Sequence, residues 1–490
     1  MEDKTLNTKP HAIFIPYPLQ GHLIPSAHLA MKLASQGFTI TFINTYAIHH
    51  QTSKAAQTKT GAGPDMFAKA RESGLDIRYK TVSDGLPVAF DRSLNHDQFM
   101  AALLHVFSAH VEEAVAEIVS SGEDVHCLIA DTFFVWPSKI AYKFGLLHIS
   151  FWTEPALVFT LYYHVDLLRL NCHFACQDCR EDTIDYIPGV KGIEPKDTMS
   201  YLQETETTSV CHQIIFNSFN DTKKADFVIC NSVQELEPTT ISALQHKIPF
   251  YAIGPTFFVD FSQNTLATSL WSESDCNRWL DDQPDRSVLY VSFGSYAHIT
   301  KHDLTEIANG LAQSKVSFLW VLRPDIVSSD DLNPLPQEFL EEVSDRSIIV
   351  PWCSQHNVLT HRAIGGFLTH CGWNSTLESI WCEVPLLCFP LYTDQFTNRK
   401  LVVDDWKIGI NMTNRKLIFK EDVSRNIDRL MCGKSRDAIR DRIKGVKKIL
   451  ENAVSPSGSS KQNMAQFIKD LKDKIEKKKT QSKKSICNGT

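Results

Sequence analysis

The sequence has no excess of basic residues, no long apolar run and no apolar leader segment. Its formal net charge is -7, so we expect no nucleic-acid partner, because such proteins neutralise phosphates with Lys and Arg. No segment reaches the ~20 apolar residues that a membrane-spanning helix requires. The N-terminal segment also lacks the apolar region of a signal peptide. We therefore expect a cytoplasmic protein without a membrane span.

A dinucleotide-binding oxidoreductase and a metal site are also disfavoured. Such an oxidoreductase carries Gly-X-Gly-X-X-Gly after its first strand, whereas Pro18–His22 occupies that position here. The 13 cysteines are sparse in a chain of 490 residues, unlike those of small disulfide-rich domains. Cys172, Cys176 and Cys179, with His173 between them, vaguely suggest zinc ligands. Because no second ligand pair follows at a suitable spacing, we expect no metal.

Short apolar runs alternate with amphipathic stretches along the chain. Runs such as Ala12–Pro16, Thr39–Ile43 and Val288–Ser292 are continuously apolar, as in parallel strands buried on both faces. Strands separated by helical segments predict an α/β protein. The chain becomes polar and aperiodic after Tyr251–Pro255, which predicts a linker between two doubly wound domains. We expect a first domain over residues 1–255, a linker over 256–275, a second domain over 276–455, a helix over 456–476 and a disordered tail over 477–490.

The segment over residues 352–395 says most about function. Trp352 follows an apolar run, at the carboxyl end of a predicted strand, where open parallel sheets bind ligands. Stacking on a flat base there is worth about 1–3 kcal/mol. His370–Ser375 follow another apolar run and lead into a predicted helix. Gly372 permits close backbone approach, and the free amides at a helix start favour an anion. Asn374 could equally cap that helix, since capping uses the same amides.

The order and span of this segment resemble the donor-binding box of plant UDP-glycosyltransferases (family 1). Further resemblances are Gln20–His22 near the start, the Ser-Asp-Gly-Leu-Pro run at Ser83–Pro87, and Ile253–Pro255 between the predicted domains. The resemblance implies a GT-B fold, with two Rossmann-like domains facing a central cleft and a C-terminal helix that crosses back onto the first domain. It also implies that a UDP-sugar is a co-substrate and that the protein needs neither a cofactor nor a metal.

The resemblance assigns parts of the donor to particular residues. His370, Asn374 and Ser375 would contact the diphosphate, and Gln355 and Glu378 the ribose. Asp394 and Gln395 would bind the sugar, and Gln in the last place usually goes with glucose. The full set predicted for the UDP-sugar is Ser292, Ser295, Trp352, Cys353, Gln355, His370, Gly372, Trp373, Asn374, Ser375, Glu378, Tyr392, Asp394, Gln395 and Thr153. Two departures stand out, Tyr392-Thr393 where Trp-Ala is frequent and Cys353-Ser354 where Ala-Pro is frequent. The first alters the sugar pocket, so the nucleotide is better specified than the sugar.

His22 and Asp131 each follow a predicted strand of the first domain. Histidine can take a proton from an acceptor hydroxyl near neutral pH, and an aspartate on its far nitrogen would fix the tautomer. A lone histidine there is more often structural, and Asp131 could instead cap the following helix. The resemblance favours catalysis, because the family uses this pair as its dyad and places Thr153 near the sugar's 6-hydroxyl. It implies inverting transfer of glucose from UDP-glucose to a hydroxyl.

The first domain should shape the acceptor pocket, and we expect the protein to be a monomer. Candidate lining residues near predicted loop ends are Tyr17, Leu19, Phe90, Phe133, Phe134 and Trp152. A small lipophilic flavonoid, phenol, terpenoid or hormone-like alcohol would fit, and the sequence does not choose among them. One alternative is an inactive nucleotide-sugar-binding protein, which would be expected to lose His22 or Asp131. Another UDP-sugar enzyme of the same fold would need a carboxylate pair near the sugar.

Overall fold

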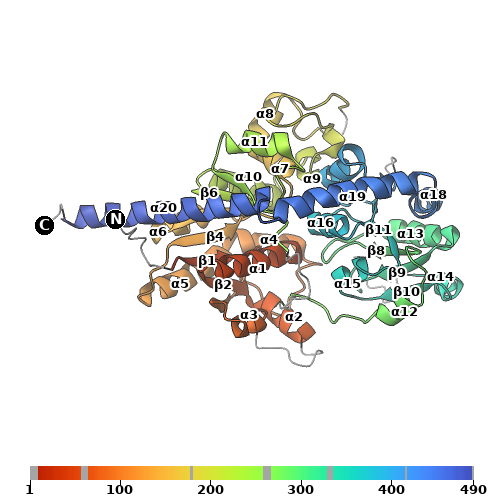
Figure 1. The fold of residues 1–490 in the computed structure, drawn as a ribbon, viewed down its shortest axis with the longest axis horizontal. Coiled ribbons are helices and arrows are strands. Elements are labelled where there is room, and N and C mark those ends of the chain that lie inside the picture. The colour runs from red at the N-terminus through yellow and green to blue at the C-terminus, as the bar shows by residue number, and fades with distance from the viewer. Residues whose placement is uncertain are drawn as a thin grey trace.

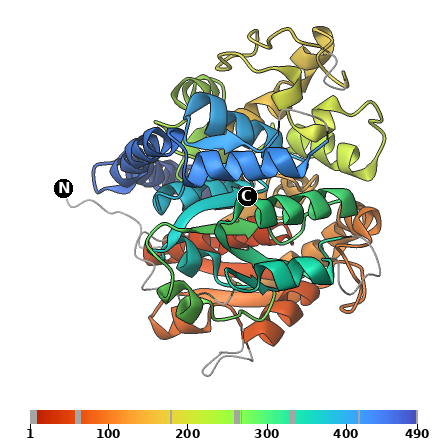
Figure 2. The same cartoon turned by 90° about the vertical axis from the view of Figure 1, so that its right-hand side faces the viewer.

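The computed structural model describes residues 9–56, 65–176, 180–257, 266, 268–327, 335–413 and 417–487, with side chains through residue 481. The chain forms two α/β units, each built on one parallel sheet (Figures 1 and 2). The central strands of both sheets are mostly apolar and are buried on both faces, as is typical of parallel sheets. The predicted doubly wound GT-B architecture is confirmed.

The first sheet has the strand order β3-β2-β1-β4-β5-β6-β7. Its strands are β1 (His11–Ile15), β2 (Thr39–Thr45), β3 (Ile77–Val82), β4 (Cys127–Asp131), β5 (Leu147–Trp152), β6 (Phe227–Cys230) and β7 (Phe250–Ala252). The second sheet has the order β10-β9-β8-β11-β12-β13. Its strands are β8 (Val288–Ser292), β9 (Ser317–Val321), β10 (Ser347–Val350), β11 (Ile364–Thr369), β12 (Leu386–Cys388) and β13 (Gly409–Asn411).

Helices separate the strands of both sheets, as the sequence pattern predicts. In the first unit they are α1 (Gln20–Ser35), α2 (Tyr46–Ala56), α3 (Ala68–Glu72), α4 (His96–His105), α5 (Phe107–Ser120), α6 (Pro137–Lys143), α7 (Ala156–Tyr163), α8 (Val165–Leu170), the 3-10 turn η1 (Pro195–Asp197), α9 (Ser200–Gln203), α10 (Val210–Thr222) and α11 (Pro238–Gln245). In the second they are α12 (Asn277–Asp281), α13 (Lys301–Ser314), α14 (Gln337–Val343), α15 (Gln355–Leu359), α16 (Trp373–Trp381), α17 (Gln395–Lys400), the short π-helix η3 (Leu401–Asp405), α18 (Lys420–Met431) and α19 (Ser435–Val454).

Within the described ranges, no single helix is long and apolar enough to cross a bilayer. Only α4 and α5 taken together, which are bent relative to each other, have the required length and apolarity.

Each sheet has a point where its strand order reverses, and the site residues follow these strands. In the first sheet this point lies between β1 and β4, and in the second between β8 and β11. Open α/β sheets bind ligands at such points, beyond the carboxyl ends of the strands. His22 follows β1 and Asp131 ends β4. Ser295 follows β8 and His370 follows β11. The topology thus places residues that are distant in sequence at two corresponding sheet edges.

The helix α20 (Ser459–Cys487) returns from the second unit and runs along the first (Figure 1). It buries Phe467, Leu471 and Ile475 in the core around the first sheet. The sequence predicts a helix over residues 456–476 and a disordered tail from 477, whereas the structure continues the helix through Cys487. Lysine is a good helix former, and Lys479 Nζ lies 2.7 Å from Asp124 Oδ2. This ion pair joins the helix beyond residue 477 to the first unit, and residues 488–490 lie outside the described ranges.

The helix α1 also differs from the sequence prediction. The pattern predicts a helix near Ser26–Ser35, but α1 begins at Gln20. Gly21 and Pro25 conceal its first turns, because both residues are poor helix formers. This shift matters for the site, since His22 lies in the first turn of a helix and not in a loop.

Candidate active site

His22 and Asp131 form a direct hydrogen-bonded pair. His22 Nδ1 lies 2.7 Å from Asp131 Oδ2, and Asp131 is only 2% exposed. A neutral histidine that donates from Nδ1 has Nε2 as its acceptor nitrogen, so this contact favours the tautomer that can take a proton at Nε2. Thr153, directly after β5, places Oγ1 2.9 Å from the same Nδ1. Side chains that follow three neighbouring strands therefore meet around one nitrogen of the His22 ring.

Neighbouring groups hold both members of the pair in place. The backbone amide of Phe133 donates to Asp131 Oδ1 at 3.0 Å, which leaves Oδ2 directed at His22. The His22 ring packs against Tyr17 and Phe133, with ring centroids 5.5 and 5.4 Å away. These rings restrict rotation of the imidazole, as a positioned base requires.

Two adjoining cavities lie between the α/β units. The first, called here the dyad cavity, contains His22 and has a volume of about 440 Å³. The second, called here the Trp352 cavity, has a volume of about 290 Å³. They share a wall formed by Gly21, Ser295, His370, Gly372, Trp373 and Asn374. A ligand that spans this wall would reach from Trp352 to His22.

The structure divides the predicted site residues between these cavities. The Trp352 cavity is lined by Ser292, Ser295, Trp352, Cys353, Gln355, His370, Gly372, Trp373, Asn374, Ser375 and Glu378. The dyad cavity is lined by His22, Thr153, Tyr392, Asp394, Gln395, Tyr17, Leu19 and Phe133. The residues predicted for the nucleotide and those predicted for the sugar and acceptor thus lie on opposite sides of one wall.

Phe90, Phe134 and Trp152 differ from the sequence prediction, since they line neither cavity. Trp152 is 1% exposed and Phe134 is 2% exposed, so both belong to the core. Trp152 points away from the cavity and donates from Nε1 to the carbonyl oxygen of Pro155 at 2.8 Å. Successive strand residues face opposite sides, and the sequence does not show which side faces the pocket. Phe90 lies in a loop described below.

The ring of His370 separates the turns that follow β8 and β11. A Cβ added to Gly294 or Gly372 would lie 2.7 or 2.5 Å from this ring, so only glycine fits at both positions. Burial, together with the cation of Arg323, lowers the pKa of His370 to about 4. The ring is therefore neutral near pH 7, and it can contact an anion only as a hydrogen-bond donor. The free amides at the start of α16 adjoin it, after the N-cap residue Gly372.

Gln355, Ser375 and Glu378 form a polar group within the Trp352 cavity. Gln355 Nε2 donates to Glu378 Oε2 at 2.8 Å and to Ser375 Oγ at 3.1 Å. Burial raises the pKa of Glu378 to about 7. The hydrogen bond from Gln355 fixes the position of this carboxyl group, whose ionised form can accept hydrogen bonds from a vicinal diol.

Asp394 and Gln395 are fixed by the turn that precedes α17. Asp394 accepts from Thr393 Oγ1 at 2.8 Å and from Asn398 Nδ2 at 2.6 Å. Gln395 Oε1 accepts from the backbone amides of Leu391 and Tyr392 at 2.9 and 3.2 Å. Because its oxygen is committed to the turn, Gln395 presents its amide nitrogen as a donor to a ligand. Thr393 adopts a left-handed backbone with φ of 59°.

Known proteins resemble this chain over most of its length. The family model described as "UDP-glucoronosyl and UDP-glucosyl transferase" matches residues 267–440. UDP-glycosyltransferase 86A2 of Arabidopsis thaliana is 62% identical over 468 residues, which are 95% of each chain. The chain belongs to the plant UDP-glycosyltransferases. The 7-deoxyloganetin glucosyltransferase of Gardenia jasminoides is 36% identical over 492 residues, covering 96% of this chain and 99% of the relative.

Solved structures of the family share the fold of this transferase. Os79 from O. sativa in complex with UDP matches with a TM-score of 0.81 at 27% identity, over 94% of this chain and 100% of that one. UGT2 of Phytolacca americana, complexed with UDP-2fluoro-glucose and pterostilbene, matches with a TM-score of 0.76 at 26% identity, over 95% and 100% of the two chains. Within the described ranges of the transferase, no three His, Cys, Asp or Glu side chains are grouped as metal ligands would be. Cys179 of the suggested zinc motif lies outside those ranges.

Arg323 supports the site of the transferase and is not among the residues predicted from the sequence. It is 1% exposed, and its guanidinium donates to Asp325 Oδ1 at 2.9 Å, to the Ala297 carbonyl oxygen at 2.7 Å and to the Gly294 carbonyl oxygen. It therefore fixes the turn after β8 that lines both cavities. Its place directly after a buried strand, at the ligand-binding edge, was the available signal.

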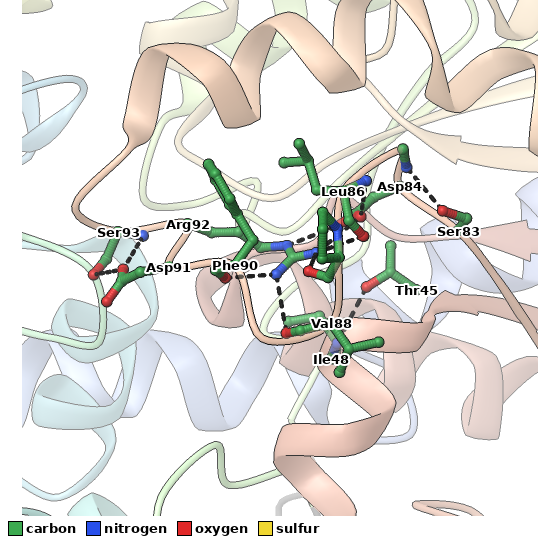
Figure 3. A network of polar contacts seen from close by, with 12 residues as sticks. Thr45, Ile48, Ser83, Asp84, Leu86, Val88, Phe90, Asp91, Arg92 and Ser93 are labelled. Carbon is green, nitrogen blue, oxygen red and sulfur yellow. Dashed lines mark hydrogen bonds and ion pairs between the residues drawn. The ribbon is translucent and has the colours of Figure 1, made fainter.

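A second arginine organises the loop over residues 83–93 (Figure 3), called here the rim loop because its last residue, Ser93, lines the dyad cavity. Arg92 forms an ion pair with Asp84 at 2.7 Å and donates to the carbonyl oxygen of Phe90 at 2.8 Å. The loop turns back on this guanidinium, which explains why Phe90 lies outside the cavity. Ser93 Oγ then reaches across to Asp325 Oδ2 at 3.1 Å. The rim loop therefore joins the two units of the transferase beside the cavity.

Trp373 and Tyr296 supply further contacts between the units. Trp373 is 3% exposed, and its Nε1 donates to the Asn231 carbonyl oxygen at 2.7 Å. Trp373 thus joins the units at the shared wall. On the other side, the Tyr296 hydroxyl lies 2.7 Å from His96 Nδ1 and 2.9 Å from the Arg92 carbonyl oxygen.

Proposed function

We propose that this transferase moves glucose from UDP-glucose to a hydroxyl group of a small lipophilic acceptor, with inversion at the anomeric carbon. In this proposal His22 is the general base and Asp131 positions it. The observation that carries the proposal is the 2.7 Å contact between His22 Nδ1 and Asp131 Oδ2, inside a cavity that also contains Asp394 and Gln395.

The electron and proton movements of the proposed reaction balance without a further reactant. The acceptor hydroxyl gives its proton to His22 Nε2, and its oxygen forms a bond to the anomeric carbon. The bond from that carbon to the β-phosphate oxygen breaks, and its electron pair leaves with UDP. The Asp131 carboxylate stabilises the imidazolium that forms. Attack on the face opposite UDP gives the inverted, β-linked product.

The Trp352 cavity supports a nucleotide diphosphate as the donor's leaving group. Trp352 can stack on the uracil, since aromatic contact of this kind is worth about 1–3 kcal/mol per base. Glu378 and Gln355 are placed to bind the ribose diol. The free amides at the start of α16 can stabilise the negative charge that grows on the diphosphate as the bond breaks.

Glucose is the proposed sugar because of the pair Asp394 and Gln395. A fixed carboxylate and a fixed amide donor can read the positions of neighbouring sugar hydroxyls, since a missing partner leaves a buried polar group unpaired. The names of relatives also favour glucose, because the Gardenia jasminoides relative is a glucosyltransferase and the Phytolacca americana structure contains UDP-2fluoro-glucose.

The dyad cavity supports a lipophilic acceptor of modest size. Its volume of about 440 Å³ lies within the usual range for small-molecule sites, about 300–1,000 Å³. Tyr17, Met100, Phe133, Ile214 and Ile215 supply apolar lining. The pterostilbene in the Phytolacca americana structure is an acceptor-sized ligand of a relative. A cytoplasmic location, a monomeric state and independence of metals remain predictions from the sequence.

Product analysis with purified protein tests the proposal. The protein is incubated with UDP-glucose, UDP-galactose or UDP-glucuronate and a panel of phenols, flavonoids and terpenoid alcohols, and UDP release, product mass and anomeric configuration are measured. The proposal expects acceptor-dependent UDP release, greatest with UDP-glucose, and a β-glucoside. UDP binding without release under any condition would instead support the inactive nucleotide-sugar-binding protein.

A further inference from the structure

Glu154 is a buried carboxyl group that the reaction described above does not use. It follows Thr153, lines the dyad cavity and is 9% exposed. Among the described residues, its Oε2 has no hydrogen-bond partner and is shielded from solvent. A buried polar atom without a partner is costly, and in native structures such atoms are uncommon. Because the residue lines the cavity, a ligand there can bind this carboxyl group through its other oxygen, Oε1.

A neighbouring glutamate, Glu237, already fills the usual structural role of a carboxylate at this helix end. Glu237 is also buried, but it accepts hydrogen bonds from the backbone amides of Ala156 and Leu157 at 2.9 and 2.7 Å and from the Ser232 hydroxyl. These contacts satisfy the free amides at the start of α7. Glu154 lies at the same end of α7, yet the capping position is already occupied.

The charges around the dyad cavity indicate what kind of ligand would meet Glu154. Within the described residues, the lining contains no lysine and no arginine. Burial lowers the pKa of His96, His298 and His370, so these side chains of the lining are neutral near pH 7. Burial, with the carboxylates of Asp394 and Asp131 close by, raises the pKa of Glu154 well above its usual range. The neutral form of a carboxylic acid can donate a hydrogen bond.

We propose that Glu154 is a specificity-determining residue, which binds an uncharged oxygen of the acceptor away from the reacting hydroxyl and so selects uncharged acceptors over carboxylates. This inference rests on the proposed function, because it assumes that the acceptor occupies the dyad cavity. An acceptor carboxylate would meet the carboxylates of Asp131 and Asp394 with no lysine or arginine in the lining to offset them, and would lose its hydration on entry.

Three naphthalene acceptors separate the effects. All three carry the reacting hydroxyl. Methyl 6-hydroxy-2-naphthoate also has a remote uncharged ester oxygen, and 6-hydroxy-2-naphthoate has a carboxylate in its place. 2-Naphthol has no substituent at that remote position. For the wild type we expect kcat/KM to be highest for the ester and at least about tenfold lower for the carboxylate. Glu154→Leu should lower kcat/KM for the ester by about tenfold, mainly through KM, and leave 2-naphthol within about twofold.

Two further variants and a control complete the test. Glu154→Gln keeps a neutral hydrogen-bond donor, so its kcat/KM for the ester should be close to that of the wild type. Glu154→Lys should shift the preference in kcat/KM towards the carboxylate. Glu204→Gln, at a side chain that is 47% exposed and outside the lining, should leave all three acceptors unchanged. Two results would overturn the inference. One is a higher wild-type kcat/KM for the carboxylate than for the ester. The other is a Glu154→Leu variant in which kcat/KM falls equally for the ester and for 2-naphthol.

Failure of the proposed function gives a different result. If no acceptor causes UDP release from UDP-glucose, the glucosyl-transfer proposal is wrong. Glu154 is then judged by calorimetric binding of the ester and 2-naphthol to the UDP-loaded protein. Tighter binding of the ester, lost in Glu154→Leu, would still support its role, and equal affinities would overturn it.

Discussion

The side-chain amide of Asn374 donates a hydrogen bond to the carbonyl oxygen of Gly21 at 2.6 Å. The two residues are 353 positions apart in sequence, and each lies at the strand-order reversal of its own sheet. Gly21 immediately precedes His22, and Asn374 lies in the first turn of α16. One contact therefore connects the turn proposed to bind the diphosphate with the helix that presents the proposed base.

Replacing Asn374 should affect donor binding and turnover together. Asn374→Ala removes the contact with Gly21 and a predicted diphosphate ligand, so we expect KM for UDP-glucose to rise and kcat to fall, each by about tenfold. Steady-state kinetics measures both. Asn357→Ala, at an exposed position of α15, serves as the control and should behave like the wild type. A change in KM alone would show that the contact with Gly21 does not position His22.

Gln395→His should weaken the preference for UDP-glucose over UDP-galactose. The substitution removes the amide donor and the oxygen that accepts from Leu391 and Tyr392. We expect the ratio of kcat/KM for the two donors to fall by about tenfold. Thr393→Ala is the matched comparison, since it changes the adjoining departure from the family pattern. If Gln395→His leaves the donor ratio unchanged and Thr393→Ala alters it, the turn at Tyr392-Thr393 governs the choice of sugar.

Glu378 should make nucleoside binding depend on pH. Burial raises the pKa of Glu378 to about 7, so below that pH its carboxyl is mainly protonated and above it mainly ionised. If the ribose diol donates to the ionised form, affinity rises as pH rises through 7, by about tenfold between pH 6 and pH 8. Calorimetry with uridine measures this without a titrating phosphate. Glu378→Gln should bind uridine with no such dependence, and an equal slope in both proteins would contradict the assignment.

Docking of α20 should contribute substantially to stability. Phe467 is fully buried, and its ring centroid lies 5.8 and 5.6 Å from those of Phe227 and Tyr251. Phe467→Ala should lower the free energy of unfolding by about 3–5 kcal/mol. Urea unfolding followed by circular dichroism measures the change. Lys469→Ala, on the exposed face of the same helix, should change it little, and equal small effects would show that α20 is not integral to the first unit.

The sequence predicts the carboxyl ends of the strands well, because continuous apolar runs end where parallel strands end. His22, Asp131, Ser295 and His370 each follow such a run, and the topology then brings them to the cleft. The pattern could not place residues whose role depends on side-chain direction. Trp152 is apolar like Phe133, yet it faces the core, because packing against Phe159 and Phe219 decides its direction.

Buried charges were the other group that the sequence could not reveal. Arg323 and Glu154 look like ordinary loop residues, since charged side chains beyond a strand are usually solvated. Only the folded structure distinguishes them, through the carbonyl oxygens around Arg323 and the buried, unpartnered oxygen of Glu154. The extent of α20 was likewise hidden, because a lysine-rich segment matches the composition of a disordered tail and only docking on the first unit reveals otherwise.

Kinetics of the His22→Ala variant test the central claim most directly. Acceptor-dependent UDP release from UDP-glucose is compared with UDP affinity, measured by calorimetry, in the wild type, His22→Ala and Asp131→Asn. If His22 is the base, His22→Ala lowers kcat by about 10²–10⁴-fold, Asp131→Asn lowers it in the same direction, and UDP affinity changes little in both. Near-normal turnover in His22→Ala, with UDP affinity intact, would contradict the proposed mechanism.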